Sequence, residues 1–268
     1  MEQQLLFCHA LQVPLRLRRR YGAYSAGALG TDAITFGSTY DQATSVSVNG
    51  IAFGCGVDNG GLSYSSTGMV GLGRGSLSLV AQLGVGKFSY CLTDFFNTSL
   101  GSPILFGSLA DLADPTGGTI VQSTPLVQSP HNPSRYFISL ESISLVDSGT
   151  IFTILVESAF RVVVDHVAEV LGQPVVNASS LDSPCFPAPA GAWQLPDMPD
   201  MVLHFARGAD MRLHRDNYMS FNQEESSFCL NIVGTAWTTS VLGNFQQQML
   251  FDTTVGQLSF VHTDCSKL

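Results

Sequence analysis

The sequence predicts an all-β protein built from two lobes. Short apolar runs, rich in β-branched residues, recur along the chain and end at glycine, a pattern typical of strands bounded by turns. One longer segment, residues 157–171, keeps apolar residues at helical spacing over several turns. A proline-rich connector at residues 123–133 separates two groups of strands. We therefore expect an N-terminal lobe over residues 1–134 and a C-terminal lobe over residues 135–268.

The amino-acid composition and net charge argue against some kinds of binding partner. Of the 268 residues, 45% are hydrophobic and 12% are charged, and the formal net charge is −9. These values favour a compact globular chain over a disordered one. The negative charge argues against binding to nucleic acid or to an anionic membrane surface. No apolar run in the sequence is long enough to cross a bilayer.

In the first half, the expected strands are short and lie at residues 33–36, 46–48, 51–53, 88–92 and 104–106. Asn49–Gly50 predicts a hairpin turn, and a glycine-rich loop is expected at residues 54–61. Gly68–Gly75 places bulky apolar residues before a glycine, which indicates a buried strand close to another backbone. Residues 76–84 indicate a short helix with Ser76 as its N-cap.

In the second half, apolar and polar side chains alternate over residues 136–145, which predicts one long strand. The segment 157–171 predicts a helix that ends at Gly172, with one apolar face made by Phe160, Val163, Val164, Val167 and Leu171. The remaining strands are expected at residues 201–205, 211–213, 228–233, 241–245, 249–252 and 258–261. Strands therefore dominate both halves.

A single carboxylate stands between two apolar, β-branched runs within residues 142–153. An acid among buried strands is costly unless hydrogen bonds stabilise it or it takes part in chemistry. Ser148 and Thr150 are hydroxyl donors, and Gly149 permits the tight turn that would aim them at Asp147. We predict a strand-end loop that holds the Asp147 carboxyl group in a dry environment. From these four residues alone, an ordinary turn residue remains the alternative.

Six cysteines are spread along the chain, at positions 8, 55, 91, 185, 229 and 265. None forms a Cys-x-x-Cys motif and no histidines have metal-ligand spacing, so no metal site is expected. Wide spacing fits disulfides in an oxidising compartment, although six cysteines allow about 15 pairings. Residues 1–20 are not a convincing signal peptide, because Glu2 precedes the apolar run and the arginines follow it.

Motifs for other chemistries are missing from the sequence. There is no Gly-x-Ser-x-Gly and no Walker A motif. Gly71-x-Gly73-x-Gly75 has the wrong spacing for a dinucleotide fingerprint, and no alternating strand–helix pattern follows it. We expect no cofactor.

An ordered set of short motifs resembles the pepsin-type aspartic proteases, and specifically their plant nepenthesin-like branch. Each motif alone is weak, but together they extend from Tyr21 to the C-terminus. They are Tyr21-Gly22, Gly27-x-Leu29-Gly30-Thr31, Phe53-Gly54-Cys55-Gly56, Gly68–Gly75, Phe88–Leu92, Tyr136–Leu140, Asp147–Thr150, Cys229-Leu230, Val241–Gln247 and Cys265.

The resemblance implies a bilobal pepsin-like fold and an aspartic endopeptidase. Each lobe of such an enzyme supplies one aspartate, at a strand end, in a loop crossed by a second strand. Here Asp147 is the implied catalytic residue, with Ser148, Gly149 and Thr150 as its supporting loop. Val241–Gly243 and Val70–Gly73 match the crossing strands of the two lobes. Tyr21 matches the flap tyrosine that lies over the substrate.

The same resemblance implies the surroundings of such a protein. The substrate would be a peptide or protein in the cleft between the lobes of a monomer. Cys185 and Cys229 match a disulfide of the second lobe. The location would be extracellular or in the plant endomembrane system, such as the vacuole or the cell wall. Cys8 matches no cysteine of the pattern.

The chain departs from the family pattern before the flap. The family places an Asp-Thr-Gly motif there, whereas residues 1–20 contain no aspartate. Ala23 and Tyr24 replace the usual Asp and Gly after Tyr21-Gly22, and the segment before Asp147 is short. We therefore expect a truncated member with an incomplete N-terminal lobe that retains only the second catalytic aspartate.

Three functions remain open at this point. The first is the family activity, in which two carboxylates share a proton and activate a water. The second is an inactive relative that uses its cleft as a binding or inhibitor surface, since a single acid lacks the coupled pair. The third, by analogy, is a homodimer in which two Asp147 loops meet.

Overall fold

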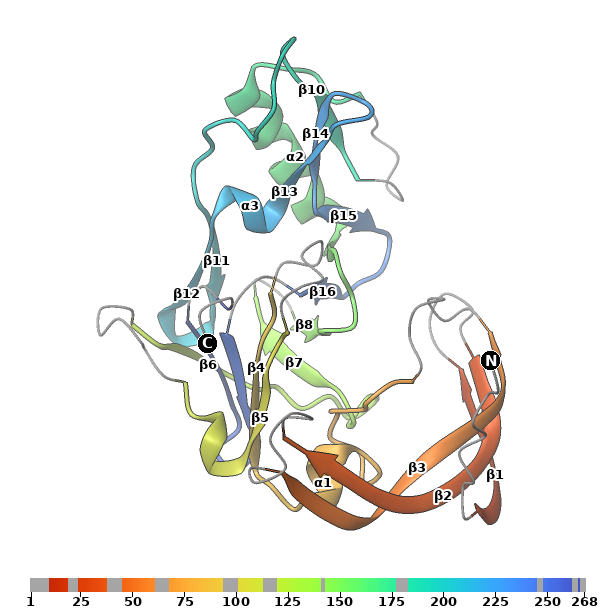
Figure 1. Ribbon diagram of the computed structural model, residues 1–268. Helices are drawn as coiled ribbons and strands as arrows, with labels where there is room; N and C mark the ends of the chain where they lie inside the picture. The colour runs from red at the N-terminus through yellow and green to blue at the C-terminus, as the bar shows by residue number, and fades with distance from the viewer. Residues whose placement is uncertain are drawn as a thin grey trace. The chain divides into compact units, whose positions relative to one another are not determined.

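The structure is a computed structural model that describes residues 10–18, 24–37, 45–60, 68–93, 101–112, 120–140, 143–176, 183–244, 248–261 and 265. Strands dominate it and helices are few, as predicted (Figure 1). The chain divides into two compact units, Met1–Val85 and Gly86–Leu268. The lobe boundary at residue 134 stays a prediction. No helix in the described part of the chain is long and apolar enough to span a membrane.

The first unit contains one antiparallel sheet of three strands in the order β1-β2-β3, with bounds Ala10–Arg18, Tyr24–Phe36 and Val46–Gly60. Figure 1 draws them as long red to orange ribbons. Of the residues of β2 and β3, only Gly30 and Ile51 are buried. These two strands therefore bury little apolar surface.

The predicted hairpin turn at Asn49–Gly50 is wrong, because both residues lie inside β3. Asp32 pairs with Ile51 and Ile34 pairs with Val48, so two residues of β3 stand opposite one residue of β2. This is a β-bulge, and Gly50 adopts its positive φ of 75°. The expected glycine-rich loop at residues 54–61 is also wrong as far as Gly60, because β3 continues to that residue.

The predicted strand at Gly68–Gly75 is absent from the structure. Residues 68–72 form no strand, and Met69 and Val70 are 49% and 64% exposed. A strand requires a neighbouring backbone to pair with, and no described strand pairs with this segment.

The short helix α1 is present but begins later than predicted. It covers Leu79–Gln82, and its N-cap is Ser78 rather than Ser76, because the Ser78 hydroxyl accepts a hydrogen bond from the Ala81 N–H. The Gln82 amide then pairs with both backbone groups of Ala52, at 2.7 and 2.9 Å, as a neighbouring peptide group would. This contact attaches α1 to the edge strand β3.

The second unit is built on two five-stranded sheets. One is antiparallel, in the order β5-β4-β17-β18-β6, with bounds Ile104–Phe106, Lys87–Cys91, Gln248–Asp252, Gln257–Val261 and Gln122–Pro125. Strand β6 overlaps the start of the segment expected to be a connector, residues 123–133. Its pairing with β18, from residues far along the chain, explains why the local sequence did not indicate a strand.

The other sheet has the order β15-β9-β16-β8-β7, with bounds Ile232–Thr235, Thr153–Val156, Ser240–Leu242, Ile143–Val146 and Tyr136–Ser139. The pairs β16–β8 and β15–β9 are parallel, whereas β7–β8 is antiparallel. The predicted long strand over residues 136–145 is therefore wrong. It is two paired strands, in which Ser139 stands opposite Ile143.

An aromatic cluster joins these two sheets. Phe251 of β17 stacks on Phe88 of β4 with ring centroids 4.9 Å apart. Tyr136 of β7 lies 4.8 Å from the same Phe251 ring. Because Tyr136 pairs with Val146 at the end of β8, this cluster supports the strand that leads into Asp147.

Helix α2, Glu157–Leu171, packs against β9 and β15, and its bounds are those predicted. Gly172, at a φ of 62°, ends the helix. Two smaller sheets, β10-β14-β13 and β11-β12, complete the unit, with bounds Cys185–Pro187, Ser227–Leu230, Met219–Asn222, Met201–Phe205 and Ala209–Leu213. The short helices are η3 at Gly107–Ala110, η4 at Ala206–Gly208 and α3 at Arg215–Tyr218.

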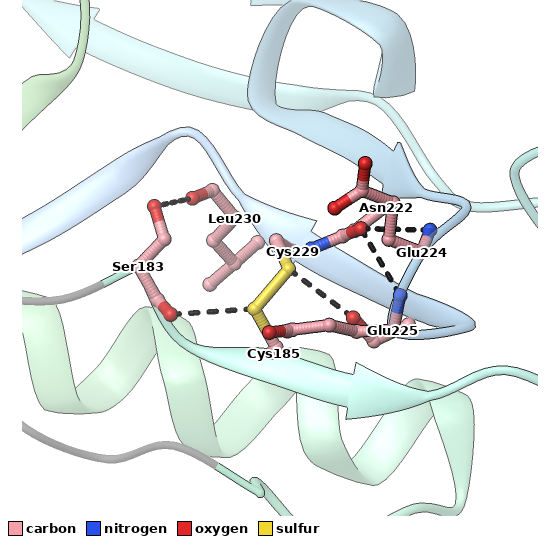
Figure 2. Close-up of a disulfide and its surroundings, with 8 residues drawn as sticks. Ser183, Cys185, Asn222, Glu224, Glu225, Cys229 and Leu230 are labelled. Atoms are coloured by element: carbon pink, nitrogen blue, oxygen red, sulfur yellow. Dashed lines mark hydrogen bonds between the residues drawn. A yellow bond between two sulfur atoms is a disulfide. The ribbon is translucent and has the colours of Figure 1, made fainter.

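Two disulfides lie within the described residues. Cys185 of β10 stands directly opposite Cys229 of β14, and the two form a disulfide (Figure 2). This is the pair that the family resemblance implies. The second disulfide joins Cys91 at the end of β4 to Cys265. Cys8 lies outside the described residues.

The buried face of α2 yields a stability prediction. Phe160 is 6% exposed, and a Cβ placed on Gly234 of β15 would lie 2.6 Å from its ring, which shows how closely helix and sheet approach. We expect Phe160→Ala to lower the free energy of unfolding by about 3–5 kcal/mol. Val162→Ala, on the same helix but 68% exposed, should change it by less than about 0.5 kcal/mol. Denaturant unfolding of both variants that gave equal midpoints would contradict this packing.

Candidate active site

Asp147 is the first residue after β8, at the edge of the sheet where β8 and β16 end together. Val146 and Leu242 are the last paired residues of these parallel strands. The Asp147 N–H donates a hydrogen bond to the Leu242 carbonyl at 3.1 Å, which extends the pairing by one residue. The backbone position of Asp147 is therefore set by the sheet rather than by the loop alone.

The loop after Asp147 holds its carboxylate from two sides. The Gly149 N–H donates to Oδ1 and the Thr150 hydroxyl donates to Oδ2, each at 3.0 Å. The Thr150 N–H donates to the Asp147 carbonyl at 3.1 Å and closes the turn. The predicted dry environment is wrong, because Asp147 is exposed. Each carboxylate oxygen thus keeps acceptor capacity for a water or a substrate.

The end of β16 packs against this loop. The Gly243 N–H donates to the Thr153 hydroxyl at 3.0 Å. The Asn244 N–H donates to the Thr150 carbonyl at 2.9 Å, and its side-chain amide donates to the Ser148 carbonyl at 3.4 Å. A Cβ on Gly243 would lie 2.6 Å from the Phe152 carbonyl oxygen, so the two backbones meet where only glycine fits.

Four of the predicted site residues come together in this loop: Asp147, Ser148, Gly149 and Thr150. Tyr21 lies outside the described residues. The Val70–Gly73 segment belongs to the first unit. In the described part of the chain, no group of three His, Cys, Asp or Glu residues could hold a metal ion.

Thr153 and Asn244 were missed as site residues by sequence reasoning. Their partners lie 90 residues away for Thr153 and 94 away for Asn244, so no local spacing links them. A polar residue directly after a glycine that ends a buried strand is a weak signal, and Asn244 has that signal.

Two family models match the chain, one in each half. They are described as xylanase inhibitor N-terminal, over residues 8–108, and xylanase inhibitor C-terminal, over residues 140–262.

Among curated relatives, the chain is 34% identical to aspartic proteinase nepenthesin-1 and 32% identical to nepenthesin-2, both from Nepenthes gracilis. It is 30% identical to aspartyl protease family protein 2 from Arabidopsis thaliana. Each alignment covers 91% of this chain but only 54–59% of the relative. The chain therefore spans less than two thirds of the length of these relatives.

A solved structure, basic 7S globulin from soybean, matches the fold with a TM-score of 0.68. The match covers 94% of this chain and 74% of the globulin, at 20% sequence identity. At that identity the likeness concerns the fold alone.

The close approach at Gly243 yields a second prediction. In Gly243→Ala the added methyl group meets the backbone of Phe152, which cannot move without disturbing β9. We expect a loss of about 1–3 kcal/mol in the free energy of unfolding. Gly101→Ala is the matched control, because a Cβ there has no atom within 4 Å. Equal stability of the two variants would show that the Asp147 loop and β16 are not packed as described.

Proposed function

Since the chain belongs to the nepenthesin-like branch of the plant pepsin-type aspartic proteases, we propose that Asp147 is one carboxylate of a two-carboxylate endopeptidase centre. The observation that supports this most is the loop geometry. Both oxygens of an exposed carboxylate accept one hydrogen bond each from its own loop, at 3.0 Å. Such a group is fixed in direction and still accessible to a water and a peptide.

Peptide hydrolysis of this kind needs a second acid. Two carboxylates about 3 Å apart cannot both ionise, so they share a proton and titrate as a unit. The ionised member takes a proton from the attacking water, and the protonated member donates to the carbonyl oxygen of the peptide. Asp147-Ser148-Gly149 is the single Asp-Ser/Thr-Gly sequence among the 268 residues.

The residues after the loop support a peptide as substrate. Ile151 and Phe152 are 48% and 40% exposed and directly follow Thr150. Apolar side chains beside a fixed carboxylate offer contacts for the side chains of an extended peptide. We propose a peptide or protein substrate and a monomeric protein.

The disulfides support an oxidising location. Cys91–Cys265 and Cys185–Cys229 are rare features for a protein of the reducing cytosol. We propose an extracellular or endomembrane compartment, such as the plant cell wall or vacuole.

A binding protein is the second candidate function. Both matching family models are described by xylanase inhibition rather than by proteolysis. With one Asp-Ser-Gly loop, the chain would then bind a glycosidase without cleaving it. Calorimetric titration with xylanases tests this candidate, and Asp147→Asn should leave such binding unchanged because no proton transfer is involved.

The proteolysis proposal predicts that any cleavage of peptides at acidic pH depends on Asp147. Asp147→Asn keeps the shape of the side chain but removes its proton chemistry, and we expect a loss of at least about 100-fold in kcat/KM. Asp252→Asn is the control, because Asp252 also accepts loop hydrogen bonds at a strand end, from the Thr254 and Val255 N–H groups. Its cleavage rate should equal that of the unmodified chain.

The measurement is hydrolysis of a fluorogenic peptide library between about pH 3 and pH 6, since such dyads work at acidic pH. Cleavage that survives in Asp147→Asn would refute the assignment. A chain that cleaves nothing but binds a xylanase would favour the second candidate.

A further inference from the structure

The peptide group between Ser148 and Gly149 makes a hydrogen bond at each of its two ends. Its N–H, which belongs to Gly149, donates to Asp147 Oδ1 at 3.0 Å. Its carbonyl, which belongs to Ser148, accepts a hydrogen bond from the side-chain amide of Asn244 at 3.4 Å. Because a peptide group is planar and trans, the direction of its carbonyl sets the direction of its N–H. The Asn244 side chain thus reaches a donor of Asp147 through one rigid group.

This peptide group is of a kind that can turn over. Residues 147–150 form a turn that the Thr150 N–H closes by donating to the Asp147 carbonyl at 3.1 Å. Turns of types I and II differ by a half-rotation of the central peptide group, and type II needs a positive φ at the third residue, which glycine accepts readily. The φ of Gly149 lies outside the positive region in this structure. The sequence of the turn therefore permits both forms, and the structure shows one.

The two forms would present opposite groups to the carboxylate. A Cβ placed on Gly149 would lie 3.3 Å from Asp147 Oδ1, which shows how closely the turn approaches that oxygen. In the turned-over form, the Ser148 carbonyl oxygen would face the carboxylate in place of the Gly149 N–H. An N–H donor favours an ionised carboxylate, whereas a second acceptor opposes it. The orientation of this one peptide group therefore matters for proton transfer by Asp147.

Asn244 is held in place independently of the turn. Its own N–H donates to the Thr150 carbonyl at 2.9 Å, and the N–H of the preceding Gly243 donates to the Thr153 hydroxyl at 3.0 Å. The residue is half-buried. A hydrogen bond of 3.4 Å is long, but this one only has to favour one of two turn forms over the other.

We propose that Asn244 is a positioning residue, whose side chain keeps the turn in the form that points the Gly149 N–H at Asp147. It acts through the Ser148–Gly149 peptide group rather than by its own contact with the carboxylate. The inference rests on the proposed function of Asp147, but it concerns a different residue and is tested separately.

Asn222 provides the matched control. It is half-buried like Asn244, and its side-chain oxygen accepts hydrogen bonds from the Glu224 and Glu225 N–H groups at 3.1 and 3.2 Å (Figure 2). It therefore also supports a turn of the second unit, the one between β13 and β14. Replacing it removes an amide of the same size that has no hydrogen bond to the Asp147 loop.

The first experiment compares Asn244→Leu with Asn222→Leu by the backbone amide signals and hydrogen exchange of the full-length chain. Asn244→Leu should displace the Gly149 signal and speed its exchange, while the Asp147 and Thr150 amides stay protected, because both turn forms keep those two hydrogen bonds. Asn222→Leu should leave all three unchanged. An unaltered Gly149 amide in Asn244→Leu would overturn the proposal. Loss of protection at all three amides would also overturn it, since Asn244 would then only hold the loop folded.

The second experiment uses Asn244→Asp, which keeps the shape of the side chain. An ionised carboxylate cannot donate to the Ser148 carbonyl, whereas a protonated one can. At about pH 7 the Gly149 signal of this variant should differ from that of the unmodified chain, and at about pH 3 the difference should shrink as the new carboxyl group becomes protonated. The same difference at both pH values would refute the role of the donor, whatever the stability of the variant.

Activity separates this inference from the proposed function. If the chain cleaves peptides, Asn244→Leu should lower kcat by roughly 10- to 100-fold and change KM little, because a misdirected carboxylate affects the transition state more than binding. Asn222→Leu should change neither constant. An equal loss of kcat in both variants would contradict a specific role for Asn244. If the unmodified chain cleaves nothing, the proposed function fails, while the two spectroscopic experiments still decide whether Asn244 sets the turn.

Discussion

The contact on which the site depends is the hydrogen bond from the Asp147 N–H to the Leu242 carbonyl. It continues the parallel pairing of β8 with β16 past the last strand residues. Parallel strands present their ends at one edge of a sheet, so this pairing brings the Asp147 loop and Gly243 together although they are distant in sequence. The loop then adds local hydrogen bonds, and Asn244 and Thr153 add long-range ones. A carboxylate that these hydrogen bonds already hold in one orientation would lose little conformational freedom on binding a substrate.

Features fixed by neighbouring residues could be predicted from the sequence, and features fixed by distant ones could not. Helix α2 has its predicted bounds because its apolar spacing and Gly172 are both local signals. The Thr150 hydroxyl was predicted as a donor to Asp147 for the same reason, since it lies three residues away. The second donor is the Gly149 N–H rather than the predicted Ser148 hydroxyl, because the path of the turn decides which group faces the carboxylate. Thr153 and Asn244 were missed because their partners are set by the order of strands in the sheet.

The wrong predictions have a related cause. A glycine with positive φ serves a hairpin turn or a bulge equally well, and only the pairing of β2 with β3 shows that Gly50 serves a bulge. Likewise, Met69 and Val70 have strand-like side chains, but a strand forms only where a neighbouring backbone is available. The same dependence on a neighbour made the connector around β6 look irregular and the β7–β8 pair look continuous.

The chemistry of the family sets a requirement that one loop cannot meet. The Asp147 carboxylate is held in one orientation, is exposed, and follows directly from paired strands. A group that transfers protons needs these properties. A pair of carboxylates is what lets one group be protonated while its neighbour is ionised. We therefore propose less than activity, namely that the residues of this chain form the Asp147 half of such a two-carboxylate centre before any substrate binds.

Hydrogen exchange at individual backbone amides tests that claim most directly. The N–H groups of Asp147 and Asn244 are the two that connect the loop to β16 and back. In the full-length chain without substrate, both should exchange as slowly as the paired amides of β8 and β16. Exchange of either amide at the rate of an unstructured peptide would show that the loop is not formed in advance.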